Sequence, residues 1–448
     1  MCTVKSSRAA VLLGLLALLL TTAPAVPSVA SGPAPAAGTA TVRTAAPVPG
    51  ATAKRKVVTP PQVKGVVIDA ATRTSLALNF PGVRAAKRYE VWQADNYNMR
   101  GSRMVRKVAA PGRVWVTGLT SGRRYCFQVR GVSKKQVVRV VKIRRKNGTV
   151  KKKKIKRVIY GQRSMRVCKA PIPVEGSGGG PRYKVATYNV CVGPCENRRG
   201  SKPGVPWSTR RPWAARFVQD LAPDVLGLQE AGGRTEIPGA FGMREAYEIR
   251  GKSLLYNDNR FSLATDQSGA RTGAIDLGTD SQVRHAVWAE LVDHTNADRS
   301  VIFVSAHFAP STDNQAASDR ARAANTRALL NGVAAVNTGG RPVVVVGDFN
   351  SHPGRTYDSP SKLFGAAGFH DSYEVARSLV KPHHNSGNQF QPVPIVGAAQ
   401  GYHMDRIWVS GRSTRVLQWR NGAQFANGRY SPLPSDHSPI MATIALNP

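Results

Sequence analysis

Four consecutive valines, Val343–Val346, stand in the C-terminal half of the chain and run directly into Gly347-Asp348-Phe349-Asn350. A short apolar run of β-branched residues that stops at a glycine is typical of a buried strand. In open α/β sheets, polar groups at the carboxyl end of such a strand lie in the crevice that binds ligands. The run therefore predicts a buried strand that presents a carboxylate and a carboxamide at a ligand site.

Strands and helices alternate throughout residues 183–448. The expected elements are the strands Tyr183–Val190, Val225–Gln229 and Val301–Ser305 and the helix Gln315–Val336. A further helix is expected to carry Trp213, Phe217 and Leu221 on one face. This order predicts a layered α/β domain over residues 183–448.

The N-terminus has the pattern of an export signal. Lys5 and Arg8 precede the apolar run Ala9–Leu20, and Ser28-Val29-Ala30 resembles a cleavage site. The apolar run is too short to span a bilayer comfortably, so an uncleaved membrane anchor is the disfavoured alternative. We therefore expect a signal peptide at 1–30, a secreted extracellular protein, and no transmembrane segment after cleavage.

Four cysteines stand after the expected cleavage site: Cys126, Cys168, Cys191 and Cys195. An even number of cysteines outside the cytosol predicts two disulfides. The pairing that joins neighbours is Cys126 with Cys168 and Cys191 with Cys195. A four-cysteine zinc site is the competing interpretation, but no C-x-x-C spacing supports it.

Two linkers divide the chain, an Ala/Pro-rich one at 31–59 and a Gly-rich, flexible one at 171–182. Between them, short alternating segments with turn signals predict a small antiparallel sandwich over residues 60–170. The segments are Ser75–Phe80, Tyr89–Gln93, Val114–Val116, Tyr125–Val129 and Ser164–Val167.

The segment Gly118–Arg130 resembles the corner of a fibronectin type III domain, where a leucine turn leads into a strand with an inward tyrosine. Tyr89-Glu90-Val91-Trp92 and Gly161-Gln162-Arg163-Ser164 fit the middle and last strands of that family. The resemblance covers about residues 60–170 and implies an all-β sandwich for this part of the chain.

A basic insertion at 134–157 departs from that family, since it contains thirteen Lys and Arg residues and no acidic residue. Asn147-Gly148 at its centre is typical of a two-residue hairpin turn. A ribbon that is charged on both faces can bury neither, so we expect it to project by roughly 30 Å at about 3.3 Å per residue. The residues expected to bind polyanions are Lys142, Arg144, Arg145, Lys146, Lys151, Lys152, Lys153 and Lys154.

The charge of the whole chain is uneven. The formal net charge is +38; residues 1–180 carry 35 Lys and Arg against 4 Asp and Glu, and residues 181–448 carry 29 against 22. This excess favours polyanionic partners. A nucleic-acid backbone, anionic cell-wall polymers and lipid headgroups would all fit the insertion, and a solvated charge run is the alternative. Phosphate contacts carry no sequence specificity.

Polar residues at strand ends form a set of six short strings in the C-terminal part. The strings are Thr187-Tyr188-Asn189-Val190, Leu228-Gln229-Glu230, Val304-Ser305-Ala306-His307-Phe308, Gly347-Asp348-Phe349-Asn350, Met404-Asp405-Arg406-Ile407 and Ser435-Asp436-His437. Together they resemble the endonuclease/exonuclease/phosphatase superfamily and its deoxyribonuclease-like members. The resemblance spans almost all of residues 183–448. It implies a four-layer α/β sandwich, in which two stacked mixed sheets are flanked by helices, and metal-dependent hydrolysis of a phosphoester.

The resemblance also implies a metal site formed by Asn189, Glu230 and Asp436. A phosphodiester is anionic and resists attack, so a hard divalent cation is needed to neutralise it. Mg²⁺ prefers carboxylate and carbonyl oxygens, and Mn²⁺ or Ca²⁺ are the alternatives.

The remaining polar residues receive catalytic roles from the same resemblance. Asp348 or His437 acts as general base, and Asp405 orients the His437 imidazole. Asn350 donates to a nonbridging oxygen, and His307 stabilises the charge there or protonates the leaving group. Which of Asp348 and His437 takes the proton is left open at this point.

The expected function is therefore that of a secreted, metal-dependent phosphodiesterase, and specifically a nuclease acting on DNA, RNA or both. A phospholipid- or sphingomyelin-type phosphodiesterase is the first alternative, in which the basic insertion meets headgroups. A non-catalytic protein that binds polyanions or the cell wall is the second. A serine triad is excluded because the chain has no G-x-S-x-G motif.

Overall fold

The computed structural model describes residues 57–145, 147–197, 204–280, 282–297, 299–353, 356–394, 396 and 402–448. The expected signal peptide, most of the 31–59 linker and Lys146 lie outside the described residues. Among the helices in the described ranges, none combines the length and the apolar character that a membrane crossing requires.

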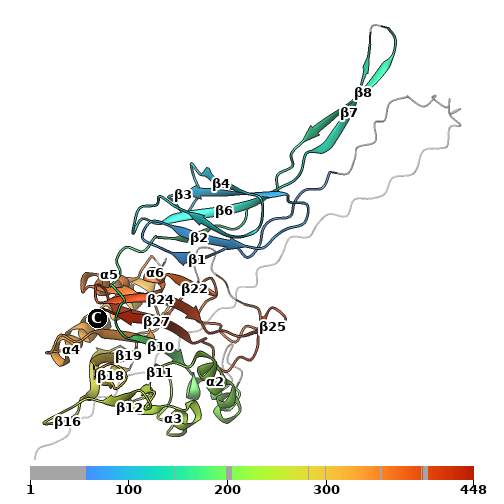
Figure 1. Cartoon of the computed structure of the whole chain (residues 1–448). Helices are drawn as coiled ribbons and strands as arrows, with labels where there is room; N and C mark the ends of the chain where they lie inside the picture. The colour runs from blue at the N-terminus through green and yellow to red at the C-terminus, as the bar shows by residue number, and fades with distance from the viewer. Residues whose placement is uncertain are drawn as a thin grey trace, which may run out of the picture. The chain divides into compact units, whose positions relative to one another are not determined.

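The N-terminal domain is a β-sandwich (Figure 1). Its two sheets have the strand orders β1-β2-β5 and β4-β3-β6-β9. The strands are β1 (Val67–Ala71), β2 (Leu76–Phe80), β3 (Arg88–Ala94), β4 (Arg103–Val108), β5 (Gly112–Val116), β6 (Tyr125–Val132) and β9 (Val167–Lys169). Alternate residues such as Leu76, Leu78, Phe127 and Val129 are fully buried between the sheets. The expected alternation of apolar residues therefore does form the core of this domain.

The last strand of the sandwich begins later than the sequence predicts. The expected segment was Ser164–Val167, whereas β9 covers Val167–Lys169. Ser164 is instead held to β6 irregularly: its N donates to Val129 O at 2.7 Å, and its Oγ accepts from Val129 N at 2.9 Å. A side chain takes part in the pairing here, which breaks the regular ladder. The expected disulfide Cys126–Cys168 is present and links β6 to β9, where the two cysteines are directly opposite.

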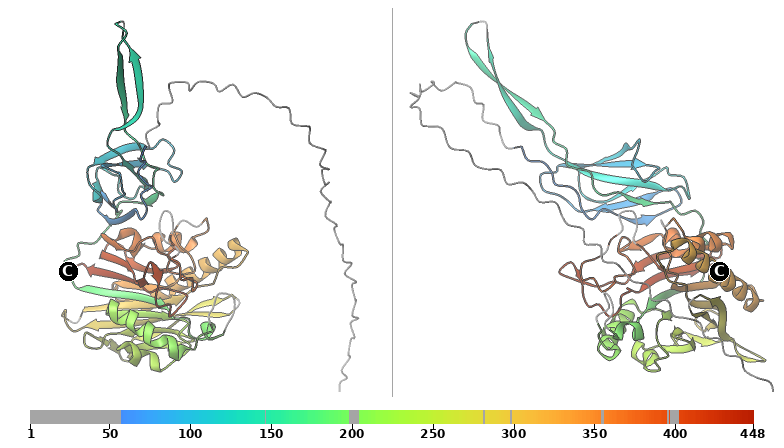
Figure 2. Two further views of the ribbon diagram at one scale, coloured as in Figure 1. Left: turned by 90° about the vertical axis from the view of Figure 1, so that its right-hand side faces the viewer. Right: turned by 180° about the vertical axis from the view of Figure 1, so that it is seen from behind.

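The basic insertion forms a two-stranded hairpin of β7 (Gln136–Arg144) and β8 (Val150–Arg157). Within the part of the chain that the structure describes, the two strands pair only with each other, and the views in Figure 2 show no third strand beside them. Gly148 takes φ 82° in the turn, a left-handed conformation that glycine adopts without strain. Lys142 is opposite Lys152, and the next pair, on the other face, is Ile143 with Lys151. Both faces of the ribbon therefore carry cations.

The C-terminal domain contains two large sheets. The first has the order β12-β13-β11-β10-β27-β24-β22, and the second has the order β14-β18-β19-β20-β23-β21 with β17 beside β18. The strands of the first are β10 (Arg182–Asn189), β11 (Val225–Gln229), β12 (Arg244–Ile249), β13 (Lys252–Tyr256), β22 (Ser378–Val380), β24 (Thr414–Asn421) and β27 (Ile440–Leu446). Those of the second are β14 (Phe261–Leu263), β17 (Thr272–Thr279), β18 (Val283–Asp293), β19 (Arg299–His307), β20 (Val343–Asp348), β21 (Phe369–Asp371) and β23 (Asp405–Ser410).

Short elements complete this domain. Two small hairpins are β15 (Thr265–Asp266) with β16 (Gly269–Ala270), and β25 (Phe425–Ala426) with β26 (Arg429–Tyr430). The helices in the described residues are α1 (Val192–Glu196), α2 (Trp207–Leu221), α3 (Glu236–Phe241), α4 (Gln315–Val336), α5 (Ser359–Ala366) and α6 (Ser372–Val375).

The valine run shows how the layers are built. Val344 and Val346 lie in the core between the two sheets, whereas Val343 and Val345 pack with residues of α4 and α5 on the outer face of the second sheet. Residues of α2 and α3 pack in the same way against β10 and β11 of the first sheet. β20 is thus buried on both faces, as its sequence predicts.

Two expectations about this domain differ from the structure. Trp213 is 42% exposed, so only Phe217 and Leu221 of the expected apolar face of α2 are buried. The Gly-rich segment is also attached to the domain: Gly176 N donates to Thr414 O at 3.0 Å, and Gly180 N donates to Leu446 O at 2.9 Å. A Cβ atom at Gly180 would lie 2.4 Å from the backbone oxygen of Asn447. Glycine at this position therefore lets the segment pack closely against the end of the chain.

The sandwich and the C-terminal domain share a buried contact. β1 pairs with β22 through Ala70 and Ser378, which joins one sheet of the sandwich to the first sheet of the C-terminal domain. Nearby, the Lys169 side chain is fully buried, and its Nζ donates to the backbone oxygens of Tyr373 at 2.7 Å and Glu374 at 3.0 Å. The Glu374 carboxylate lies 3.7 Å away. Burial lowers the pKa of Lys169, and Glu374 offsets part of this effect.

Lys169→Met is expected to lower the free energy of unfolding by about 3 kcal/mol, because the backbone oxygens of Tyr373 and Glu374 lose a buried donor and the Glu374 carboxylate keeps only its ion pair with Arg124. Urea unfolding followed by tryptophan fluorescence would measure the change. Lys107→Met, which alters an exposed lysine on β4 of the same sandwich, is the control and should have little effect. Equal midpoints for the two variants would contradict the structural role assigned to Lys169.

Candidate active site

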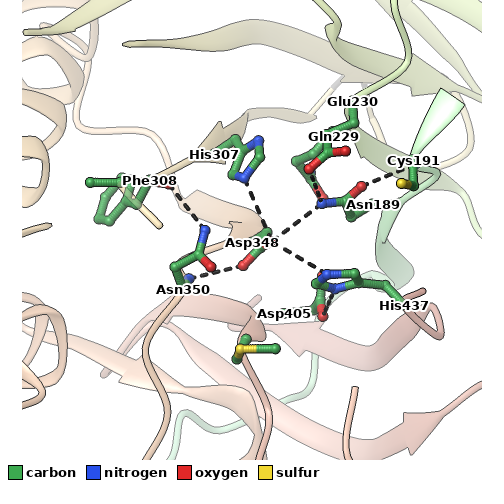
Figure 3. A network of polar contacts seen from close by, with 12 residues as sticks. Asn189, Cys191, Gln229, Glu230, His307, Phe308, Asp348, Asn350, Asp405 and His437 are labelled. Atoms are coloured by element: carbon green, nitrogen blue, oxygen red, sulfur yellow. Dashed lines mark hydrogen bonds and ion pairs between the residues drawn. The ribbon is translucent and has the colours of Figure 1, made fainter. Parts of the chain in front are cut away.

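The ends of four strands bring polar side chains to one place (Figure 3). Asn189 ends β10 and Glu230 follows β11, and these strands are parallel with Asn189 opposite Gln229. His307 and Asp348 end β19 and β20 and lie opposite each other in a parallel pair. Antiparallel β23 adds Asp405, which is opposite Asp348. Strand register therefore aligns residues that are far apart in the sequence.

Asp348 is the centre of this network. Its Oδ2 accepts from Asn189 Nδ2 at 3.3 Å and lies 3.6 Å from His307 Nε2 and 3.8 Å from His437 Nε2. Its Oδ1 accepts from Asn350 N at 2.9 Å. Burial alone would raise the pKa of Asp348, but the two imidazoles and these donors hold it below its ordinary value. These partners thus favour the ionised form of a buried carboxylate.

Asp405 and His437 form a second pair beside Asp348. His437 Nδ1 lies 2.8 Å from Asp405 Oδ2, and the Asp405 side chain is fully buried. Burial alone would lower the pKa of His437, but the carboxylates of Asp405 and Asp348 raise it well above its ordinary value. Because Asp405 occupies Nδ1, the Nε2 of His437 is the nitrogen that faces Asp348. The pair fixes the direction of the imidazole, as the sequence-based role of Asp405 requires.

Glu230 offers the clearest position for a cation. Its Oε1 accepts from Asn189 Nδ2 at 3.1 Å, whereas its buried Oε2 has no hydrogen-bond partner among the described residues. A buried carboxylate oxygen without a donor is unfavourable, and a divalent cation would satisfy it. Glu230 takes φ 55°, a conformation that non-glycine residues adopt rarely and that clusters at functional sites. The residues therefore fit a metal ion at this edge.

The other two expected ligands are placed differently. Asn189 presents Nδ2 to the carboxylates, and its Oδ1 accepts from Cys191 N at 3.1 Å. A carboxylate oxygen of Asp436 lies within 4.8 Å of the sulfurs of Cys191 and Cys195. Those sulfurs form the second expected disulfide and cannot act as thiolate ligands. Of the three expected ligands, Glu230 is the one with a buried, unsatisfied oxygen.

His307 and Asn350 lie on the opposite side of Asp348 from His437 (Figure 3). The side chain of His307 is 12% exposed, and burial lowers its pKa. Asn350 takes φ 50°, and its Nδ2 donates to Phe308 O at 3.1 Å. This bond ties the turn after β20 to the turn after β19, so the two residues are held next to each other at the Asp348 carboxylate.

Two residues that support the site were not found from the sequence. Arg210 is 1% exposed, and its guanidinium donates to the carbonyl oxygens of Val190, Cys191 and Val192, and to Pro434 O at 2.7 Å. It thus joins the loop after Asn189 to the loop before His437. Ser386 Oγ accepts from Asp405 N at 3.1 Å and Met404 N at 3.0 Å. The residues that Arg210 and Ser386 contact are distant from them in the sequence, so no local motif could reveal these roles.

A comparison with models of protein families identifies the part of the chain that holds these residues. The model of a family described as the endonuclease/exonuclease/phosphatase family matches residues 186–437, which include every strand end described above. No curated protein matches.

Many solved structures are similar to this chain, and three of them serve as examples. One is an endonuclease/exonuclease/phosphatase family protein from Bacteroides thetaiotaomicron, with 19% identity over 60% of this chain and 99% of that chain and a TM-score of 0.48. A mannosyl-6-phosphatase from the same organism has 19% identity over 59% and 100%, with a TM-score of 0.47. The catalytic domain of human nocturnin has 17% identity over 60% and 94%, with a TM-score of 0.44.

Proposed function

The chain belongs to the endonuclease/exonuclease/phosphatase family, and from this premise we propose that it is a secreted, metal-dependent phosphodiesterase that hydrolyses nucleic acid. It is a hydrolase that acts on phosphoric esters, and enzymes of this family generally depend on a divalent metal. The observation that carries the proposal is the buried Asp348 carboxylate, whose Oδ2 faces Asn189, His307 and His437 together. This arrangement can accept a proton and stabilise a phosphoryl group at one point.

In the proposed mechanism, Glu230 would hold the cation through its unsatisfied Oε2, with Asn189 beside it. A divalent cation bound there would neutralise the charge of the phosphodiester. The proton of the attacking water passes to the Asp348–His437 pair, and Asp405 keeps the imidazole aligned through Nδ1. Beside Asp348, Asn350 stabilises a nonbridging oxygen, and His307 stabilises the charge there or protonates the leaving oxygen.

Nucleic acid is the substrate class that best fits the basic hairpin. Residues 134–157 hold no acidic residue, and the described lysines of β8 are exposed on both faces of the ribbon. Such a surface binds phosphate chains through release of their counterions. Lys142, Arg144, Arg145 and Lys151–Lys154 are proposed to make these contacts.

Two further parts of the proposal concern the cell and the N-terminal domain. The disulfides Cys126–Cys168 and Cys191–Cys195 support an oxidising, extracellular compartment for a chain that begins with an export pattern. The sandwich at 60–170 is proposed to be fibronectin type III-like. Its three-stranded and four-stranded sheets, and the Tyr125 hydroxyl that accepts from Thr120 N at 3.1 Å, support that assignment.

The proposed function is tested by incubating the secreted protein with plasmid DNA, RNA or sphingomyelin, each with Mg²⁺, Ca²⁺ or a chelator. Nucleic acid should be cleaved in the presence of a divalent metal, and the chelator should lower the rate at least about 100-fold, because the site then lacks its neutralising charge. Gel electrophoresis and headgroup release are the measurements. Headgroup release without nucleic-acid cleavage would move the substrate to the lipid class, and cleavage that persists with the chelator would contradict the metal site.

A further inference from the structure

Lys252 is a buried lysine near the site that the mechanism above does not use. It begins β13 and is 7% exposed. It directly follows Gly251, whose carbonyl oxygen accepts from Ala231 N at 2.9 Å. β13 therefore starts beside the turn that carries Glu230, and Glu230 is among the charges that act on the Lys252 ammonium group.

The Lys252 ammonium group has no counter-ion in the part of the chain that the structure describes. Its Nζ donates to Arg250 O at 3.0 Å, and no carboxylate oxygen there is within ion-pair distance. Burying an ammonium group without a counter-ion is strongly unfavourable. An anion of the substrate that pairs with this ammonium group would offset the free-energy cost of its burial.

Other cations increase the positive charge at this position. Arg284, 2% exposed and paired with Asp280 at 3.1 Å, lies near the start of β18. The register of β18 with β19, in which Ala286 is opposite Ala306, places Arg284 beside the strand end that carries His307. Burial lowers the pKa of Lys252, and repulsion from Arg284 and Arg250 lowers it further. A phosphate group would relieve this repulsion.

We propose that Lys252 is the centre of an anion subsite that binds a second phosphate group of the substrate, next to the one that is hydrolysed. The inference rests on the proposed function, because a polynucleotide has a phosphate on each side of the scissile one and a sphingomyelin-type lipid has a single phosphodiester. A lysine ammonium group suits this role as a compact point charge for phosphate.

The test compares two substrates. Lys252→Met removes the charge and keeps the length of the side chain. It should lower kcat/KM for a DNA oligonucleotide about tenfold, mainly through KM, because a charge-assisted hydrogen bond to phosphate is lost. Hydrolysis of bis(4-nitrophenyl) phosphate, which has one phosphorus atom, should be unchanged. Lys252→Arg should retain most activity on DNA. Lys184→Met, which alters an exposed lysine at the opposite end of β10 from Asn189, is the control.

A second measurement separates this inference from the proposed function. Thymidine 3′,5′-bisphosphate should inhibit bis(4-nitrophenyl) phosphate hydrolysis by the parent protein about tenfold more tightly than thymidine 5′-monophosphate, and Lys252→Met should remove this difference. This result does not require that nucleic acid be a substrate. Equal inhibition by the two nucleotides, or an equal loss on both substrates in Lys252→Met, would overturn the subsite and make Lys252 a support for Glu230.

Discussion

An Asp348→Asn variant is expected to hydrolyse phosphodiesters about 10³-fold more slowly than the parent protein, with the change in kcat. Asparagine has nearly the same shape, and its single amide oxygen can keep the hydrogen bond from Asn350 N, whereas Asn189 Nδ2, which donates to the other carboxylate oxygen, loses its acceptor. What the variant loses is the negative charge that faces His307 and His437. An amide can neither take the proton of the attacking water nor hold the His437 imidazolium.

The measurement is steady-state hydrolysis of bis(4-nitrophenyl) phosphate, followed by cleavage of plasmid DNA. Both should fall together, because the small diester needs the same proton transfer. Asp258→Asn, which removes an exposed carboxylate elsewhere in the domain, is the matched control and should leave kcat unchanged. Thermal unfolding of both variants would show that the loss is not a folding defect. A folded Asp348→Asn variant with parental kcat would remove Asp348 from the mechanism.

The sequence predicts the layers of the C-terminal domain because its local patterns are consistent with its packing. The helix Gln315–Val336 has the predicted bounds, and the valine run forms β20 with both faces buried. Trp213 is exposed although it shares a helical spacing with Phe217. Spacing alone cannot tell how far the buried stripe of a helix extends, since that depends on the facing sheet.

The polar supports of the site could not be predicted in the same way. Glu230, His307, Asp348 and Asp405 were found because each lies at or next to the end of a strand and belongs to a family string. Arg210 lies inside α2 without any such signal, and its acceptors are up to 224 residues away. Its role is defined only by loops that fold around it. The roles of Lys169 and Lys252 could not be predicted for a similar reason. The chain has 64 lysines and arginines, and each is expected to be a surface charge until its burial is known.

The Gly-rich segment shows a second kind of limit. Glycines in a row predict a flexible linker from composition. Here Glu175 forms ion pairs with Arg377 at 2.8 Å and Arg415 at 3.5 Å, and Gly180 fits against the Asn447 backbone. Glycine makes an isolated chain flexible, but it also allows two backbones to pack very closely. Which of these outcomes occurs depends on the tertiary contacts of the segment.

Replacing residues 134–157 by Asn-Gly is expected to remove most of the salt-dependent affinity for DNA. The ends of the deleted segment are already adjacent, since Ser133 N donates to Ile159 O at 2.9 Å, so Asn-Gly together with Val158 can form a short turn that joins them. If about six of the hairpin cations contact phosphates, the parent loses at least about 10³-fold in affinity between 50 and 200 mM salt. The variant should show a slope of log K against log salt that is smaller by about 5.

Matched triple variants test whether position or net charge is responsible for this affinity. Lys151, Lys152 and Lys153 on β8 are changed to Gln in one variant, and the exposed Arg103, Arg106 and Lys107 on β4 are changed to Gln in the other. Both remove three charges, but only the β8 variant should reduce the slope, by about 3 units. Turnover of bis(4-nitrophenyl) phosphate should stay at the parental value in both, because this substrate has no chain of phosphates for the ribbon to follow. Equal slopes for the two variants would show that the hairpin acts only through the overall charge, and an unchanged slope after deletion would remove it from binding altogether.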